Sequence, residues 1–173
     1  MTAEGETHAD MSRPSASLAR AQAALAEVRD PELPFLTLSD MGILRDVRDA
    51  DGTIEVDITP TYSGCPATDV IRLDVETALA RAGLERVRVR SVLSPAWTTD
   101  WLTEEARRKL RENGIAPPVK AAGKRALFSA QEITCPACAS VDTERVSEFG
   151  STPCKAHYRC RACREPFEYF KCI

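Results

Sequence analysis

Residues 53–59 read TIEVDIT, in which apolar β-branched side chains alternate with acidic ones. This period of two predicts a β-strand with one buried side and one side facing water. A second strand is expected before it, over about residues 43–47, and Asp49-Ala50-Asp51-Gly52 supplies the turn between the two. The sequence therefore predicts an antiparallel pair of strands at the centre of the fold.

The chain that follows this pair predicts a helical crossover. A loop over residues 60–64 leads to Cys65-Pro66, and a helix is expected from there to about Ala82, with Gly83 as its stop. Its inward-facing residues are Ile71, Val75, Ala78 and Leu79. Valines then alternate with arginines over residues 86–90 and predict a third strand. Strand, helix and strand in this order imply a parallel pair joined by a right-handed crossover.

Two more helices complete the expected first domain. One runs from a Ser17 cap to Arg29, where the two prolines of residues 30–34 stop it. The other covers about Thr103 to Glu112. The expected fold is of the α/β class in its two-layer α+β form, a small three-stranded sheet with covering helices, followed by a zinc-ribbon-like domain.

The pattern along the chain divides it into four parts. Residues 1–15 are polar and are expected to be a disordered tail, and residues 16–115 hold the first domain. Residues 116–128 contain two prolines and three basic side chains and are expected to be a linker. Residues 129–173 are rich in cysteine and form the predicted ribbon.

The ribbon is predicted by two C-x-x-C pairs, Cys135-Pro136-Ala137-Cys138 and Cys160-Arg161-Ala162-Cys163. Each pair can hold two thiolates on one tight turn, and two such turns complete a tetrahedral metal site. A domain this small buries little apolar surface, so a structural zinc ion would contribute most of its folding free energy. The same thiolates also suit an iron–sulfur cluster, and the spacing leaves both open.

Three further residues of the ribbon are candidate ligands. Cys154 and Cys172 are possible extra thiol ligands, although packing as small buried side chains is the simpler interpretation. His157, next to Tyr158, is expected to be an ordinary surface or half-buried histidine.

Cys65 stands apart from the other cysteines, since it precedes Pro66 at the expected start of a helix. A thiol at that position lies close to the positive end of the helix, which favours its thiolate form. Hydroxyl groups on Thr61, Ser63 and Thr68 could donate hydrogen bonds to the thiol or to its cargo. A buried structural cysteine is the competing interpretation, and no nearby histidine could serve as the base of a Cys–His hydrolase.

Composition excludes several classes of protein. The formal net charge of −3 shows no excess of basic residues for neutralising phosphates, so nucleic acid is not an expected partner. No apolar run is long enough for a membrane helix, and the first 15 residues lack the apolar core of a secretory signal. A cytoplasmic location is expected, where cysteines serve metal binding or thiol chemistry before disulfides. Trp97 and Trp101 lie four residues apart and could share one helical face; they are expected in the core, with a partner-binding patch as the alternative.

Several ordered motifs of the chain resemble known families. About residues 16–115 resemble the SufT-type domain of iron–sulfur cluster assembly, on Asp30-Pro31-Glu32, Asp40-Met41-Gly42-Ile43 and Thr59-Pro60-Thr61-Tyr62-Ser63-Gly64-Cys65-Pro66. The whole chain is similar to the PaaD family, small accessory proteins encoded with the multicomponent phenylacetyl-CoA epoxidase. The segments that carry this second resemblance are Ser94-Pro95-Ala96-Trp97-Thr98-Thr99-Asp100-Trp101, Gly114-Ile115-Ala116-Pro117-Pro118 and Glu165-Pro166-Phe167-Glu168-Tyr169-Phe170-Lys171-Cys172.

The resemblance implies a maturation factor in aerobic phenylacetate breakdown rather than a catalytic component. Iron or an iron–sulfur cluster would reach the oxygenase or reductase of the epoxidase through Cys65, the implied functional thiol. Asp40 would cap or orient the loop that carries this cysteine, unless it is a structural turn or helix cap. The resemblance also implies a homodimer in which two Cys65 thiols share a cluster.

Two other functions stay open from the sequence. The chain could be a structural subunit that remains in the epoxidase complex and moves no metal. It could also be a thiol oxidoreductase, although tight metal binding by the ribbon pairs opposes their cycling to a disulfide.

Overall fold

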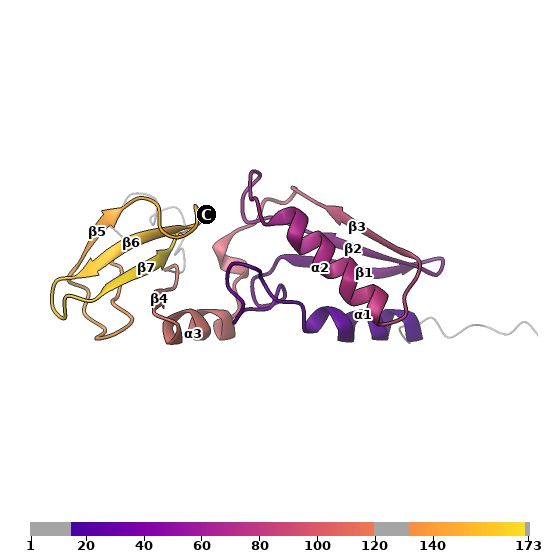
Figure 1. Cartoon of the computed structure of the whole chain (residues 1–173), viewed down its shortest axis with the longest axis horizontal. Helices are drawn as coiled ribbons and strands as arrows, with labels where there is room; N and C mark the ends of the chain where they lie inside the picture. The colour runs from indigo at the N-terminus through magenta and orange to yellow at the C-terminus, as the bar shows by residue number, and fades with distance from the viewer. Residues whose placement is uncertain (1–14, 120–131, 172–173) are drawn as a thin grey trace, which may run out of the picture.

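The computed structural model describes residues 15–119 and 132–171, which form two units side by side (Figure 1). The first unit contains a three-stranded sheet with two covering helices, and the second is an all-β ribbon at the opposite end of the molecule. In chain order the elements are α1 (Ala16–Ala26), β1 (Leu44–Ala50), β2 (Thr53–Ile58), α2 (Thr68–Arg81), β3 (Val87–Ser91), the 3-10 helix η1 (Thr99–Trp101), α3 (Glu104–Glu112), β4 (Ile115–Ala116), β5 (Thr143–Ser147), β6 (Lys155–Cys160) and β7 (Pro166–Phe170). Within these residues no helix is both long and apolar enough to span a bilayer.

The first sheet has the order β1-β2-β3, with β1 antiparallel and β3 parallel to the central strand. The β-branched side chains of β2 are buried and its acidic ones face the other side, as the alternation predicts. Helices α1 and α2 lie together on the buried face (Figure 1). On the open face Arg48 of β1 forms ion pairs with Glu55 and Asp57 of β2. The predicted two-layer fold and its parallel crossover are therefore confirmed.

Three element boundaries differ from those expected. Helix α1 begins one residue before the predicted Ser17 cap, because the Ser15 Oγ accepts from the Leu18 N–H at 3.1 Å, and it ends at Ala26. Strand β1 extends to Ala50, because Asp51 and Gly52, with φ of 51° and 77°, make a two-residue turn. Helix α2 begins at Thr68 rather than at Pro66, so Cys65 lies outside its first turn.

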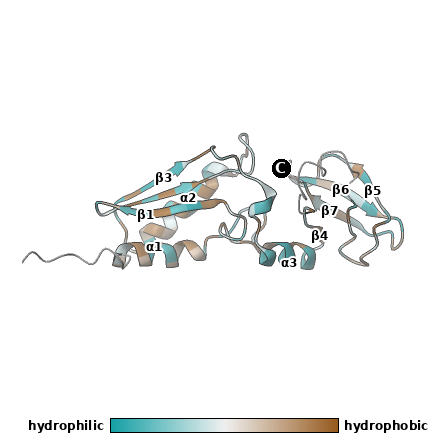
Figure 2. Cartoon of the chain, turned by 180° about the vertical axis from the view of Figure 1, so that it is seen from behind, coloured by the Kyte–Doolittle hydropathy of each residue, from teal (hydrophilic) through white to brown (hydrophobic). Residues whose placement is uncertain are grey.

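The second sheet has the order β4-β7-β6-β5. Its short strand β4 pairs in parallel with β7 and follows directly on α3, whose surface is mostly hydrophilic in Figure 2. The end of the expected first domain and the start of the expected linker are thus part of the ribbon sheet. Residues 1–14 of the predicted tail and 120–128 of the predicted linker lie outside the described residues.

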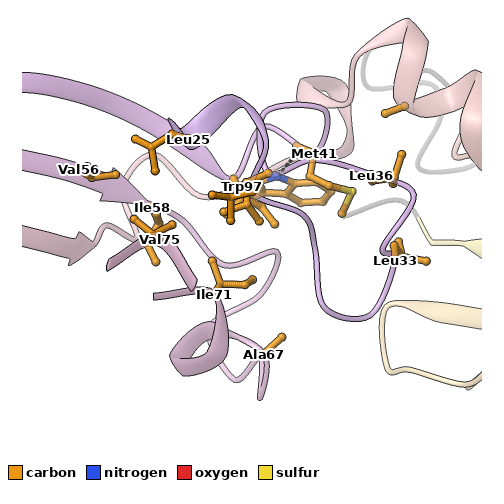
Figure 3. Close-up of a cluster of buried hydrophobic side chains, with 14 of the residues drawn as sticks. Leu25, Leu33, Leu36, Met41, Val56, Ile58, Ala67, Ile71, Val75 and Trp97 are labelled. Atoms are coloured by element: carbon orange, nitrogen blue, oxygen red, sulfur yellow. Dashed lines mark hydrogen bonds between the residues drawn. The ribbon is translucent and has the colours of Figure 1, made fainter. Parts of the chain in front are cut away.

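The two units share one hydrophobic core. Cys154 and Phe170 of the ribbon belong to the same buried cluster as the side chains of the first sheet and its helices. The Phe170 ring lies 6.3 Å, centroid to centroid, from that of Trp97. The Trp97 indole N–H donates to the Met41 carbonyl at 2.9 Å (Figure 3). The ribbon is therefore packed against the first unit by apolar contacts and not only tethered to it.

The two tryptophans do not share a helical face. Trp97 is buried in a segment without regular secondary structure and confirms the core interpretation. Trp101 ends η1 and is half-buried, with the guanidinium of Arg45 3.5 Å from its ring centroid. The expected helix fails because η1 begins only at Thr99, two residues after Trp97.

Candidate functional site

The four cysteines of the two C-x-x-C pairs converge at one end of the ribbon. Their sulfur atoms all lie within 4.8 Å of one another, with Cys135 3.7 Å from Cys163 and Cys138 3.6 Å from Cys160. A tetrahedral ion with metal–sulfur distances of about 2.3 Å requires sulfur–sulfur distances of about 3.8 Å. The spacing of the thiols therefore fits a four-thiolate metal site.

Electrostatics within this cluster also favour a bound cation. The N–H of Cys163 points at the Cys160 sulfur at 3.5 Å and lowers the pKa of Cys160 to about 7. The N–H of Glu165 favours the thiolate of the exposed Cys163, but partial desolvation and the neighbouring thiols raise the pKa of Cys163 to about 12. Four thiols this close cannot all ionise alone, and a metal ion removes that conflict.

The extra ligand candidates do not join this cluster. Cys154 is buried in the shared core, which agrees with the packing interpretation, and His157 is exposed on β6. Cys172 lies outside the described residues. The predicted set of Cys135, Cys138, Cys160 and Cys163 is the set that the ribbon brings together.

Cys65 lies in a turn between β2 and α2 and is half-buried. Its N–H donates to the Tyr62 carbonyl at 3.1 Å, and its own carbonyl accepts from the Thr68 N–H and hydroxyl. Thr68 therefore holds the backbone of Cys65 rather than its thiol. Ser63 is exposed and does not line the cavity beside Cys65, whereas Thr61 is buried and does.

Cys65 opens into a small cavity with a volume of about 20 Å³. Asp30 and Glu32, from the loop after α1, line its wall, and Cys154 lines it from the ribbon. The rest of the wall is mostly apolar and includes Leu33, Ala67 and Ile71, which Figure 3 labels. The cavity thus combines sulfur and oxygen donors in largely apolar surroundings.

The two acids differ in exposure, since Asp30 is buried and Glu32 is exposed, but desolvation is the first cause of the pKa shift of each. Desolvation raises the pKa of Asp30, although its Oδ1 accepts from the N–H groups of Glu32 and Leu33 at 2.9 and 2.8 Å. Desolvation and the neighbouring Asp30 also raise the pKa of Glu32. The positive charge of Lys155, a buried ribbon residue, acts in the opposite direction on both acids.

Sequence reasoning missed the two acids and the place of Cys154 at this cavity. Asp30-Pro31-Glu32 was informative only as a helix stop and as part of a family resemblance. The signal that could have identified the acids is their position, since both lie among prolines in a short turn that ends a helix. No local pattern brings Cys154 to the cavity, because its neighbours there are distant in the sequence.

Asp40 has a structural role and is not part of the cavity wall. Its carboxylate accepts from the Thr37 N–H at 3.1 Å and lies 2.7 Å from the Lys109 ammonium of α3. Partial burial opposes ionisation, but Lys109 and the Thr37 donors together lower the pKa of Asp40. Asp40 therefore caps a turn, and its contacts are with α3 rather than with the loop of Cys65.

We expect Asp40→Asn to lower the free energy of unfolding at pH 7 by about 1–2 kcal/mol, because a partly buried ion pair and a turn cap are both weakened. A carboxylate with a lowered pKa stabilises the fold above its unfolded pKa, so the deficit should vanish as the pH falls below about 4. Urea unfolding of the wild type and of Asp40→Asn at several pH values measures the difference in their free energies of unfolding. Effects of pH that are common to the two proteins cancel in this difference. The exposed Asp100→Asn is the control, and an equal deficit there would contradict the assignment.

Two protein-family models match the chain. The one described as an iron-sulfur cluster assembly protein matches residues 18–93, and the one described as the PaaD zinc beta ribbon domain matches residues 119–171. The first match contains Cys65 and both cavity acids. The second contains Cys154 and the four clustered cysteines.

Similar proteins agree with this division. Over 151 residues the chain is 50% identical to an Escherichia coli (strain K12) protein that is named as a putative component of 1,2-phenylacetyl-CoA epoxidase, and the match covers 87% of this chain and 90% of the relative. An Fe-S protein maturation auxiliary factor of Porphyromonas gingivalis is 36% identical over 84 residues, 47% of this chain and 79% of its own. A crystal structure of a DUF59 domain from Bacillus anthracis covers 56% of this chain and 93% of that chain, with 26% identity and a TM-score of 0.51.

Proposed function

Because the chain belongs to the PaaD family, whose Escherichia coli relative is named as a component of 1,2-phenylacetyl-CoA epoxidase, we propose that it is a maturation factor for that enzyme. In this role Cys65 transiently holds iron or an iron–sulfur cluster destined for the oxygenase or reductase subunits. The chain binds and releases the metal cargo and performs no catalytic step itself. The epoxidase subunits are its partners.

The observation that carries this proposal is the half-buried Cys65 thiol at a cavity that also holds two carboxylates. Thiolates bind iron and other soft or borderline metals, and carboxylates add hard oxygen donors of the kind that iron also accepts. Fe-S protein maturation factors of two bacteria match about half of the chain, and the iron-sulfur cluster assembly model matches residues 18–93, which contain Cys65 and both acids. The apolar surroundings shield a bound ion from water until the cavity opens.

The four clustered thiols support a different role, that of a structural zinc site. Sulfur donors at tetrahedral spacing suit zinc, which has no redox chemistry and supplies folding free energy to small domains. The ribbon carries only a small core of its own, formed by Ala116, Ile133, Cys135, Cys160, Phe167 and Tyr169. Under this proposal zinc fixes the ribbon, and the ribbon in turn supplies one wall of the Cys65 cavity.

The proposal is tested by the iron and acid-labile sulfide content of the epoxidase subunits, purified anaerobically from cells with the wild-type chain, Cys65→Ser or no chain. We expect the serine variant to leave a client subunit as iron-poor as the deletion does. Ser63→Ala, in the same loop but away from the cavity, is the control and should load iron normally. Normal loading in every strain would exclude a carrier role for Cys65.

A structural component is the second candidate, because the Escherichia coli relative is named as part of the epoxidase itself. In that case the deletion would impair assembly of the complex, and Cys65→Ser would not. Gel filtration of the complex from the same three strains distinguishes the two functions. A complex of normal composition with an iron-poor client supports maturation.

A further inference from the structure

Two thiols from different units of the chain line the Cys65 cavity. Cys65 comes from the turn before α2, and Cys154 comes from the residue that precedes β6 of the ribbon. Cys154 is only 7% exposed and takes no part in the four-thiol cluster. The ribbon therefore contributes a cysteine to a cavity that is lined mostly by the other unit.

The ribbon holds Cys154 firmly in this place. Its carbonyl accepts from the Lys171 N–H at 3.0 Å, which ties it to the end of β7, and its sulfur lies 3.0 Å from the Thr152 hydroxyl. The next residue, Lys155, is buried and paired with Glu168 at 3.0 Å. The backbone at Cys154 is thus fixed by both neighbouring strands, and its thiol is a built feature of the cavity wall.

Charges on the two thiols and on Glu32 act on the same neighbour. Burial raises the pKa of Tyr62, and Cys65, Cys154 and Glu32 raise it further through their negative charge. Cys65, Cys154 and Glu32 also line one and the same cavity. Desolvation by burial also raises the pKa of Cys154.

The size of the cavity limits what the two thiols can hold. A volume of about 20 Å³ is room for about one water-sized particle. A single metal ion fits this space, whereas a cluster of several iron and sulfur atoms does not. Among the described residues, the ribbon cysteines are the group of three or more donor side chains that lies close enough to hold an ion, so the donors at the Cys65 cavity are more widely spaced. A site that is not preformed binds more weakly, which suits a cargo that has to be released.

We propose that Cys65 and Cys154 form a two-thiol site for one thiophilic divalent cation, with Asp30 or Glu32 as an oxygen donor. The inference rests on the proposed carrier function and names its cargo as a single ion. Each thiol releases one proton to solvent as its sulfur–metal bond forms, and the oxidation state of the metal does not change. The ribbon is then part of the cargo site.

The test is anaerobic titration of the full-length, zinc-loaded protein with Co²⁺, whose sulfur-to-metal absorption reports the number of bound thiolates. We expect the wild type to bind one equivalent of Co²⁺ in addition to the ribbon metal, with a sulfur-to-metal absorption intensity that corresponds to two thiolates. Cys154→Ser and Cys65→Ser should each weaken this binding at least about tenfold, since even loss of an outer-shell partner of a metal ligand costs 10–100-fold in affinity. Thr152→Ala keeps the Cys154 thiol, so its loss of Co²⁺ affinity should be smaller than that of either cysteine variant.

A second measurement needs no variant and so does not depend on folding. Bound Co²⁺ should protect both Cys65 and Cys154 of the wild type from alkylation by iodoacetamide, as read by mass spectrometry of peptides.

Cys154→Ala, which keeps the site apolar, should retain the zinc content and melting temperature of the wild type. Protection of Cys65 alone, or wild-type affinity in both Cys154 variants, would overturn the two-thiol site.

The outcomes also separate this inference from the proposed function. If Cys65→Ser leaves the epoxidase iron-poor while Cys154→Ser changes neither ion affinity nor iron loading, the carrier function stands and the two-thiol site is wrong. If the client is loaded normally in Cys65→Ser cells, the carrier function fails, whatever the titration shows.

Discussion

Cys160→Ser is expected to lose one equivalent of zinc per chain and the folded ribbon with it. Cys160 is fully buried at the end of β6, and its sulfur receives the N–H of Cys163 and lies 3.6 Å from that of Cys138. Apparent metal-binding free energies of structural zinc sites are about 10–16 kcal/mol, which is more than so small a domain can replace by apolar burial. Metal analysis and the dispersion of amide NMR signals from residues 132–171 measure the two losses.

The matched control is His157→Ala on the same strand. His157 is exposed and lies away from the thiol cluster, so this variant should keep both the zinc and the ribbon. Retention of a full equivalent of zinc by Cys160→Ser would show that the four-thiol site is not the metal site. Removal of zinc from the wild type by a chelator should reproduce the effect of the substitution.

Loss of the folded ribbon should also affect the core and the cavity of the first unit. Cys154 and Phe170 belong to the buried cluster of the first unit, so an unfolded ribbon leaves a gap beside Met41 and Trp97. The Cys65 cavity loses its second thiol in the same event. Iron loading of the client should therefore fail in Cys160→Ser cells although Cys65 is intact.

The sequence predicted those parts of the fold that have a local pattern. The alternation over residues 53–59 identified the central strand, and the two C-x-x-C pairs identified all four clustered thiols. Each of these features depends on spacing within a few residues, which a strand or a tight turn converts directly into geometry.

Features that depend on contacts between distant segments could not be predicted in this way. Helix α2 begins at Thr68 with no side-chain cap, so Pro66 was a misleading start signal. Asp30 and Cys154 meet at one cavity only because the ribbon docks beside the loop after α1. This docking is set by packing of Phe170 against Trp97, for which a single sequence carries no period or motif.

Removing the contact between Phe170 and Trp97 is expected to have the second large effect on the protein. Phe170→Ala should lower the free energy of unfolding by about 3–5 kcal/mol, the usual cost of removing a buried aromatic ring. Phe170 has no exposed surface, lies in the cluster shared by both units and forms part of the cavity wall. Its loss should also change the fluorescence of Trp97 and speed the alkylation of Cys154, because the ribbon no longer seals the core.

Phe149→Ala is the matched control, since the same substitution in the same ribbon removes a ring that is 63% exposed. Its expected cost is below about 1 kcal/mol, because little apolar surface is lost from the interior. Chemical denaturation followed by tryptophan fluorescence gives both values, and zinc content shows whether the metal site survives. If the two variants were equally stable, the ribbon would not be held by a shared core, and Cys154 would have no fixed place at the cavity. If Phe170→Ala alone is destabilised and keeps its zinc, the docking contact acts separately from the metal and fixes the position of the second thiol.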